Sequence, residues 1–411
     1  MSQEIKDRFR RFVAPTYGRF PITLDRGEGA YVWNTDGKRY LDLGGGIAVN
    51  CLGHAHPEIS QVLADQSSRL MHCTNFYHFE GQAQLAENLA KRLGQGRVFF
   101  CNSGGESSEV MIKLARHYGQ AEGRFEIITA ENSFHGRTMA GISATGQGKI
   151  KDGFAPLLPG FSHVPFNDLD AVHAALTPAT VAVMIEGVQG EGGIRPVSAD
   201  MMLGLRRLCD EHNLLLLWDG VQCGHFRTGS FQSFQSILGD QLGDFLPDAI
   251  GMAKALGGGF PMGAVWIAEP HAEVLGPGTH GSTFGGNPLA CAVANKILEV
   301  VDRDDLAANA TALGHFFVNE LAKLREKYSA AILEIRGLGL MIGIEMGGGF
   351  SSFDDGKPTA LQWVSALHEA GMLTIPAGSS VVRFLPPLNL TREEAQAGLD
   401  LFEQTIQKII A

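Results

Sequence analysis

Five short apolar runs, each followed by a turn and a helical pattern, constrain the fold of this chain most strongly. They are Val98–Cys101, Phe125–Thr129, Val181–Glu186, Leu214–Asp219 and Ala264–Ala268. Continuous apolar runs of this length are typical of strands buried on both faces of a largely parallel sheet, because a strand with one face in water alternates apolar and polar residues. The sequence therefore predicts an α/β core.

The sequence on either side of this core follows other patterns. Beyond Asn287 it predicts long helices, short strands and a closing helix, which together make a smaller α+β unit. The helices are expected at about 287–301, 304–327 and from 391, and the strands at Ile332–Arg336, Leu340–Glu345 and Val381–Phe384. The segment Ala30–Leu43 has the turn residues of a hairpin and is too short to fold alone. We predict an N-terminal segment (1–60) packed with the small domain, a large domain (61–295) and a C-terminal small domain (296–411).

Charge and cysteine usage exclude several classes of partner. The chain has 33 Lys and Arg against 44 Asp and Glu, a net charge of −11, and therefore no electrostatic footprint for nucleic acid or an anionic membrane. Its six cysteines lie at irregular intervals without a Cys-x-x-Cys pair, so we predict no zinc site, no other metal and no disulfide framework. No apolar run approaches the roughly 18 residues of a membrane span, and the charged N-terminus does not suit a secretory signal. We expect a cytoplasmic protein that binds small molecules or other subunits.

Two of the predicted strands are followed by turns suited to binding an anion or a ring. Ligands bind beyond the carboxyl ends of strands in an open parallel sheet. The first turn, Asn102–Glu106, could bring backbone N–H groups close to an anion, although an ordinary turn with a serine cap fits equally well. In the second, Phe134 could stack on a planar ring and Arg137 could bind a carboxylate; a packed aromatic beside a solvated arginine is the alternative.

Charged residues stand out at three further positions. Glu186 and Glu191 share a glycine-rich loop, where two exposed acids are the simpler interpretation. Asp219 ends the most apolar strand, so it should pair with a cation or have a raised pKa, unless it only caps a helix. Lys254 lies among apolar and small residues before three glycines, which makes it a candidate Schiff-base nucleophile; a surface lysine is the alternative.

An anion-binding turn, a stacking phenylalanine, a strand-end carboxylate and a lysine are together what pyridoxal phosphate requires of a protein. Nearly the whole chain resembles the class III aminotransferases of fold type I, and most closely the acetylornithine aminotransferase group. The resemblance rests on motifs in the same order: Thr16-Tyr17-Gly18-Arg19-Phe20-Pro21, Gly53-His54-Ala55-His56-Pro57, Asn102-Ser103-Gly104, Phe134-His135-Gly136-Arg137-Thr138, Gln189-Gly190-Glu191-Gly192-Gly193, Lys254, Gly281-Ser282-Thr283 and Arg383-Phe384-Leu385-Pro386-Pro387. It implies a large domain with a mostly parallel sheet and a smaller α+β domain.

The resemblance also implies residues that bind the cofactor, pyridoxal 5′-phosphate. Lys254 would form the Schiff base with it and move the substrate proton, and Asp219 would pair with the pyridine nitrogen. Phe134 and Val221 would lie on the two faces of the ring, with Gln222 near its hydroxyl. The phosphate would be bound by Ser103, Gly104 and Gly105, and by Thr283 of the neighbouring subunit of a homodimer.

The substrate would be held by charged residues at the two ends of the pocket. Tyr17 and Arg137 would bind its distal carboxylate, and Arg383 the α-carboxylate of glutamate or 2-oxoglutarate. Glu191 would neutralise Arg383 when the other substrate binds, with its flanking glycines permitting movement. The implied reaction moves the terminal amino group of an ω-amino acid, N2-acetyl-L-ornithine first among the candidates, to 2-oxoglutarate by a ping-pong route in arginine biosynthesis.

Other interpretations stay open at this point. The donor could instead be succinylornithine, ornithine, succinyldiaminopimelate or 4-aminobutyrate, since one or two pocket contacts decide such preferences. A cofactor-binding protein without turnover, or an amino-mutase of the same fold, is a further alternative. Three positions depart from the family pattern: Gly187 stands where a proline is usual, Gly220 where a glutamate is usual and Phe226 where a glycine is usual.

Overall fold

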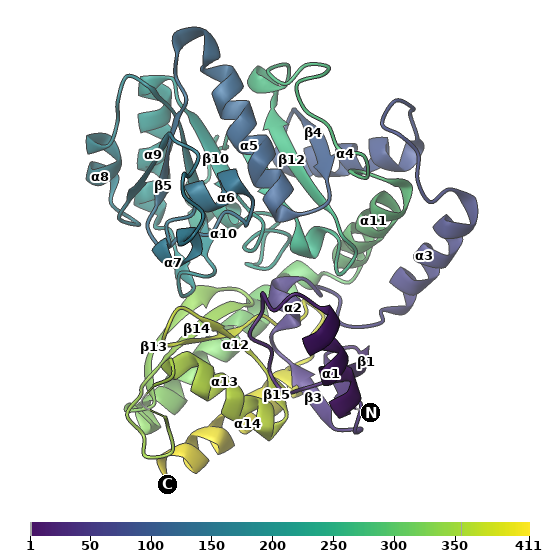
Figure 1. Ribbon diagram of the computed structural model, residues 1–411, viewed down its shortest axis with the longest axis vertical. Helices are drawn as coiled ribbons and strands as arrows, with labels where there is room; N and C mark the ends of the chain where they lie inside the picture. The colour runs from purple at the N-terminus through teal and green to yellow at the C-terminus, as the bar shows by residue number, and fades with distance from the viewer. Residues whose placement is uncertain (1, 355) are drawn as a thin grey trace.

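A seven-stranded sheet lies at the centre of the larger of two lobes in the computed structural model, which describes residues 2–354 and 356–411 (Figure 1). Its strand order is β4-β12-β11-β10-β7-β5-β6. β12 runs antiparallel to both neighbours, and the remaining pairs are parallel. The strands are β4 (Gly96–Cys101), β5 (Glu126–Ala130), β6 (Phe161–Val164), β7 (Thr180–Glu186), β10 (Leu215–Asp219), β11 (Ala249–Met252) and β12 (Gly263–Ala268). All five predicted strands are confirmed, and β6 and β11 are additional.

Helices cover both faces of this sheet, which is why its central strands β7 and β10 are buried at every position. Along β10, Leu215 and Leu217 pack in one cluster with residues of α5 (Gly104–Tyr118). Leu216 and Trp218 pack in another cluster with residues of α9 (Ala199–His212). Alternate side chains of one strand therefore enter two separate cores.

The other elements of the larger lobe are mostly short. The helices are α3 (Pro57–Arg69), α4 (Glu80–Leu93), α6 (Met139–Ala144), α7 (Gly148–Lys151), α8 (Leu169–Ala174), α10 (Ser233–Leu238) and α11 (Pro288–Arg303). A two-stranded hairpin, β8 (Val188–Gln189) and β9 (Arg195–Pro196), follows β7. The turn of this hairpin, residues 190–194, is called the gate loop below.

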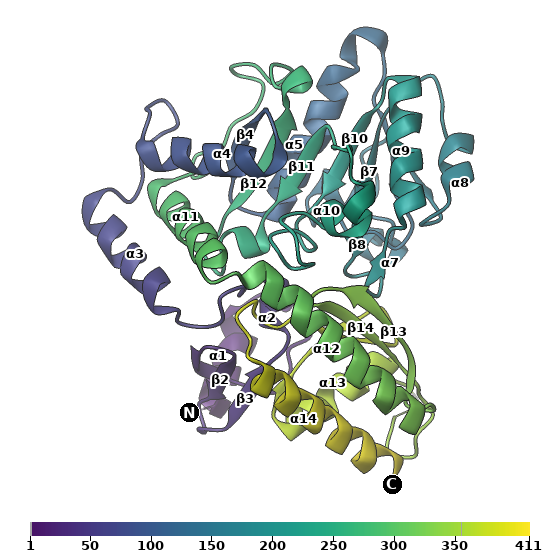
Figure 2. The same ribbon diagram turned by 180° about the vertical axis from the view of Figure 1, so that it is seen from behind.

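The smaller lobe contains a four-stranded antiparallel sheet in the order β13-β14-β17-β16. The helices α12 and α13 pack against this sheet, and α14 packs against both helices (Figure 2). The elements are β13 (Ile332–Leu338), β14 (Met341–Met346), β16 (Ile375–Ala377), β17 (Val381–Phe384), α12 (Leu306–Lys327), α13 (Thr359–Ala370) and α14 (Arg392–Ile410). The predicted α+β character of this part is confirmed.

The N-terminal segment contributes a second small sheet to this lobe. Its strands β1 (Leu24–Glu28), β2 (Tyr31–Asn34) and β3 (Arg39–Asp42) form a meander, and β3 pairs in parallel with β15 (Met372–Leu373). The helices α1 (Ser2–Phe12) and α2 (Gly45–Ala48) flank it. The domain limits at residues 60 and 295 stay a prediction.

The register of the large sheet places two acidic residues side by side. Asp219 at the end of β10 lies opposite Glu186 at the end of β7. Both are at carboxyl ends of parallel strands, where α/β proteins bind ligands. Among the described residues, no helix is long and apolar enough to cross a membrane, and no cluster of His, Cys, Asp or Glu could hold a metal ion.

Candidate active site

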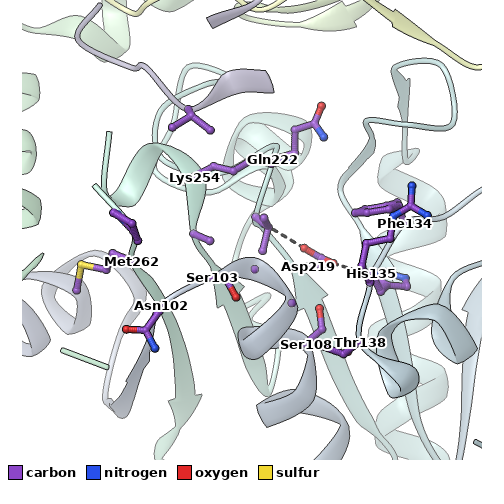
Figure 3. Close-up of a pocket in the computed structure, with 18 of the residues that line it drawn as sticks. Asn102, Ser103, Ser108, Phe134, His135, Thr138, Asp219, Gln222, Lys254 and Met262 are labelled. Carbon is purple, nitrogen blue, oxygen red and sulfur yellow. Dashed lines mark hydrogen bonds and ion pairs between the residues drawn. The ribbon is translucent and has the colours of Figure 1, made fainter. Parts of the chain in front are cut away.

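A cavity of about 640 Å³ opens at these strand ends. Figure 3 shows Lys254 and Gln222 above Asp219, and Ser108 and Thr138 below it. Nine of the residues expected from the sequence line this cavity: Ser103, Gly104, Gly105, Phe134, Arg137, Asp219, Val221, Gln222 and Lys254. The structure thus brings together side chains that lie as far apart in the sequence as Ser103 and Lys254.

The amino end of α5 supplies free backbone donors to this cavity. Ser103 caps the helix by accepting a hydrogen bond from the Glu106 N–H at 3.2 Å. No acceptor among the described residues takes a hydrogen bond from the N–H of Gly104 or Gly105. A Cβ on Gly104 would lie 2.8 Å from Val221 Cγ1, so a glycine is needed for close packing there. Such a helix terminus suits a phosphate.

Asp219 is paired with a buried histidine. His135 Nδ1 lies 2.7 Å from Asp219 Oδ2 (Figure 3), and the Val221 N–H donates to Asp219 Oδ1. Burial opposes the charged form of His135, but its hydrogen bond to Asp219 and the nearby carboxylate charges raise its pKa overall. Of the two environments expected for Asp219, a cationic partner or a raised pKa, the structure supplies a partner in His135, a residue to which the sequence analysis gave no role.

Glu186 is the second acidic residue that lines the cavity. Unlike Asp219, it had no predicted role. Its carboxylate accepts hydrogen bonds from the Phe134 N–H at 3.0 Å and the Gly190 N–H at 3.4 Å. Burial raises the pKa of Glu186 to about 8, partly offset by His135 and reinforced by Asp219. The sequence signals for both residues were present: His135 stands next to Phe134, and Glu186 ends a predicted strand.

Lys254 begins a short 3₁₀ turn with a strained backbone. Its φ is +47°, a conformation that non-glycine residues rarely adopt and that is concentrated at functional sites. Burial lowers the pKa of its ammonium, opposed by the carboxylate of Glu191. Glycine is needed at position 257, because a Cβ there would lie only 2.0 Å from Phe260 O.

Beside the cavity-lining residue Gln222, Arg383 of β17 forms a bidentate ion pair with Glu191. The two Nη–Oε distances are 2.6 and 3.2 Å, and Arg383 Nη1 also donates to Gln222 Oε1 at 3.0 Å. Burial opposes the charge on Glu191, but Arg383 holds the pKa of this carboxyl below its usual range. Gln222, expected near a ring hydroxyl, therefore also contacts the ion pair.

The glycines on either side of Glu191, Gly190 and Gly192, are closely packed against neighbouring residues. A Cβ on Gly190 would lie 2.3 Å from the Gln222 amide, and one on Gly192 would lie 2.9 Å from Asn132 O. Close packing explains why glycine is needed at these two positions.

Four expected site residues do not line the cavity. Glu191 and Arg383 lie beside it in contact with Gln222, and Tyr17 and Thr283 lie elsewhere. Tyr17 is 74% exposed and lies in the N-terminal segment. Thr283 is exposed in the loop after Gly281, beside Phe284. Both side chains lie on the surface of this chain.

The comparison with a family model decides the identity of the site. Residues 12–406 match the model described as aminotransferase class-III. This chain is a class III aminotransferase. Its cofactor is pyridoxal 5′-phosphate, its substrates are an amino donor and an oxo acid, and its fold is that of the fold-type I enzymes.

Similar proteins agree with this assignment. The acetylornithine aminotransferase of Clostridium acetobutylicum is 43% identical, covering 97% of this chain and all of the relative. The acetylornithine aminotransferase of Agrobacterium fabrum is 42% identical, with 96% of both chains covered. The ornithine aminotransferase of Toxoplasma gondii superposes with a TM-score of 0.92 at 30% identity, covering 100% of this chain and 96% of the other. The crystal structure of an acetylornithine aminotransferase from Elizabethkingia anophelis gives a TM-score of 0.84 at 32% identity, covering 99% of both.

Two of the three departures of this aminotransferase from the family pattern are explained by local packing. A Cβ on Gly187 would lie 2.3 Å from the Trp218 ring, and a Cβ on Gly220 would lie 2.2 Å from Gln232 Oε1. Each glycine thus leaves space for a buried neighbour. Phe226 has a φ of +64°, which suits glycine and makes the phenylalanine strained.

The residues around the cavity fit the cofactor. Free N–H groups at the start of α5 suit its phosphate, Phe134 and Val221 offer apolar surfaces for its ring, and Asp219 lies at the end of a buried strand. His135 Nε2 is buried without a partner among the described residues. Lys254 provides an amine whose pKa is lowered by burial.

Proposed function

We propose that this aminotransferase moves the terminal amino group of N2-acetyl-L-ornithine to 2-oxoglutarate in two alternating half-reactions. The observation that carries the proposal is the ion pair of Glu191 with Arg383, whose side chain is 1% exposed. With Arg383 neutralised, this end of the pocket suits a donor that presents an amine there without a carboxylate. Arg137 lines the cavity and remains exposed, as the donor's distal carboxylate requires.

The second half-reaction needs Arg383 to be released. Glutamate brings a carboxylate next to its amino group, and Arg383 would bind this group in place of Glu191. An arginine presents paired donors that match a carboxylate. Glu191 is 28% exposed at its side chain, so it has a route to water when it leaves Arg383.

We assign the chemical step to Lys254 and Asp219. When bound, the cofactor supplies an electron-withdrawing ring that stabilises the charge left when a substrate carbon loses its proton. Lys254 Nζ would hold the cofactor and carry that proton, for which an amine with a lowered pKa is suited. Asp219 would keep the ring nitrogen protonated, with His135 fixing the orientation of its carboxylate. Ser103, Gly104 and Gly105 would bind the phosphate.

The assignment of Lys254 is tested by borohydride reduction of the loaded enzyme followed by peptide mapping. The cofactor mass should appear on the peptide that contains Lys254 and on no other lysine peptide. Lys254→Ala should remove this label, while part of the cofactor stays bound without a covalent bond. A label on another lysine in the wild-type enzyme would contradict the assignment.

The donor is tested by single-turnover spectroscopy with a panel of amines. N2-acetyl-L-ornithine should react with the highest kcat/KM. Ornithine is the second candidate, because an ornithine aminotransferase superposes with a TM-score of 0.92; succinylornithine, succinyldiaminopimelate and 4-aminobutyrate complete the panel. A higher kcat/KM for one of these would reassign the donor within the same mechanism, and reaction with none would contradict the proposal.

We further propose that the active enzyme is a cytoplasmic homodimer in which Thr283 of one subunit completes the phosphate site of the other. Large apolar side chains are exposed around this residue: Phe76 at 92%, Tyr77 at 68% and Phe284 at 61%. Asn75 donates hydrogen bonds to the carbonyls of Ser282 and Gly285, which joins the two loops into one surface. Exposed apolar surface of this kind marks contact sites. A fully active monomer in sedimentation would contradict the dimer.

A further inference from the structure

The gate loop, residues 190–194, lies on three residues that form a straight row across the sheet of the smaller lobe. Gly343 on β14 is opposite Arg336 on β13 and opposite Arg383 on β17. Residues paired in this way share one face of a sheet. The row Arg336, Gly343 and Arg383 is called the docking row below.

Each residue of the docking row contacts a different residue of the gate loop. Arg383 binds the Glu191 carboxylate. Arg336 Nε donates to Gly193 O at 2.8 Å. Gly343 faces Ile194, and a Cβ on Gly343 would lie 2.7 Å from Ile194 Cβ. The loop is therefore attached to the smaller lobe by an ion pair, a hydrogen bond from the Arg336 side chain to the Gly193 carbonyl, and an apolar contact.

Two features indicate that the backbone contacts are strong. Arg336 is 9% exposed at its side chain and is oriented by Glu334 and Glu345, each 2.6 Å from Nη1. Ile194 is fully buried with a φ of +56°, an unfavourable conformation for a β-branched residue. It packs with Val188 and Cys223 of the larger lobe and with Met341 and Leu385 of the smaller one. A strained backbone persists only where its surroundings hold it in place.

The opposite side of the gate loop is held by the larger lobe. The Gly190 N–H donates to Glu186 Oε1, and Gly190 and Gly192 pack closely on Gln222 and Asn132. With the backbone held from both sides, the exchange of Arg383 between Glu191 and a substrate carboxylate has to occur by rotation of the Glu191 side chain.

We propose that Arg336 is a positioning residue that sets substrate specificity by holding the gate loop on the docking row. By binding the Gly193 carbonyl, Arg336 keeps the Glu191 carboxylate in position to accept both hydrogen bonds from Arg383. Loss of this contact weakens the ion pair and leaves Arg383 free for longer, so α-carboxylates bind more readily and ω-amino donors bind more often in the wrong orientation. This inference rests on the proposed exchange between Glu191 and the substrate.

The test uses Arg336→Met in the cofactor-loaded enzyme. Hydrogen exchange measured by mass spectrometry should accelerate in the peptide that covers 190–194 and remain unchanged in the strands of the large sheet. In separate half-reactions, the ratio of kcat/KM for the ω-amino donor to kcat/KM for glutamate should fall by roughly fivefold or more, chiefly through KM. Arg336→Lys retains a cation for Glu345 and should recover part of this ratio.

Arg325→Met is the matched control, because it makes the same substitution at an exposed arginine of α12 in the same lobe. It should leave both half-reactions unchanged. Gly343→Ala is a second variant, in which the added methyl group pushes against Ile194 and should lower the ratio in the same direction. Equal slowing of both half-reactions, or an unchanged ratio with unchanged exchange, in Arg336→Met would overturn the inference.

Glu191→Ala, measured in parallel, separates this inference from the proposed function. If Glu191→Ala changes the ratio and Arg336→Met does not, the docking row has no part in specificity and the exchange at Arg383 stands. If Glu191→Ala leaves the ratio unchanged, the proposed exchange itself is wrong.

Discussion

Two charge pairs flank the pocket, and they are held in opposite ways. Asp219 and His135 both belong to the larger lobe and are both buried, at 4% and 1% exposure. Glu191 and Arg383 belong to different lobes, and only Arg383 is fully buried. A pair enclosed on all sides keeps its charges constant during turnover, whereas a pair with one exposed member can exchange that member for a substrate. The pocket therefore combines a permanent electrostatic partner with a replaceable one.

Neutralising the permanent pair should have the largest effect. Asp219→Asn is expected to lower kcat by roughly 10³-fold, as loss of a preorganised charge in a dry site does, with little loss of bound cofactor. Both half-reactions should slow together, because this pair serves both. Rapid-mixing measurement of each half-reaction checks this, and an effect confined to one of them would show that the pair is not permanent.

Neutralising the replaceable pair should have a smaller and selective effect. Glu191→Gln leaves Arg383 without its counterion, so discrimination against transfer of the α-amino group of the donor should fall by about tenfold. Cofactor binding should not change. Product analysis by mass spectrometry after turnover of an ω-amino donor measures the two transfer routes, and an unchanged product ratio would contradict the exchange.

Glu186, the buried acidic residue next to Asp219, should make the stability of the fold depend on pH. The pKa of Glu186 is raised from 4.5 to about 8, so the folded state binds a proton that the unfolded chain has lost. The free energy of unfolding should therefore fall as the pH rises through this range, and the raised pKa of His135 acts in the same direction. Glu186→Gln should reduce the fall by about 1–3 kcal/mol, since one pKa unit corresponds to about 1.4 kcal/mol. Denaturant unfolding of the apoenzyme at several pH values tests this; an unchanged slope would be contrary to expectation.

Substitution of Gly220, which follows Asp219 in the sequence, should affect the catalytic reaction least and should act mainly on the stability of the fold. Gly220→Glu should destabilise the fold by about 1–3 kcal/mol, because the new side chain overpacks a buried site already filled by the Gln232 amide. Combining it with Gln232→Ala should recover part of this loss. Denaturant unfolding of both variants provides the comparison, and a single variant as stable as the wild type would show that Gln232 moves aside freely.

The strands and the cavity were largely predictable because each had a local signal. Buried strands appeared as continuous apolar runs, and Lys254 and Asp219 stood out against apolar surroundings. β6 and β11 were missed because Phe161–Val164 contains Ser162 and His163, and Ala249–Met252 is short and contains a glycine. Neither segment has a run of apolar residues long enough to distinguish a strand from a loop by sequence alone.

Contacts between distant parts of the chain were not predictable. Nothing in the sequence around His135 indicates that it meets Asp219, which lies 84 positions later. The row that aligns Arg336 with Arg383 depends on strand register and on a glycine between them. The close packing of Gly190 and Gly192 was not predictable for the same reason, since it comes from Gln222 and Asn132.

The central claim is that Arg383 serves one half-reaction and Glu191 masks it in the other. Arg383→Ala, measured by single-turnover kinetics in both directions, tests this most directly. The glutamate half-reaction should lose about 2–5 kcal/mol of transition-state binding, the usual cost of a broken arginine–carboxylate contact in a desolvated site, while the half-reaction of the ω-amino donor should change much less. Equal slowing of the two half-reactions would contradict the account and assign Arg383 to structure alone.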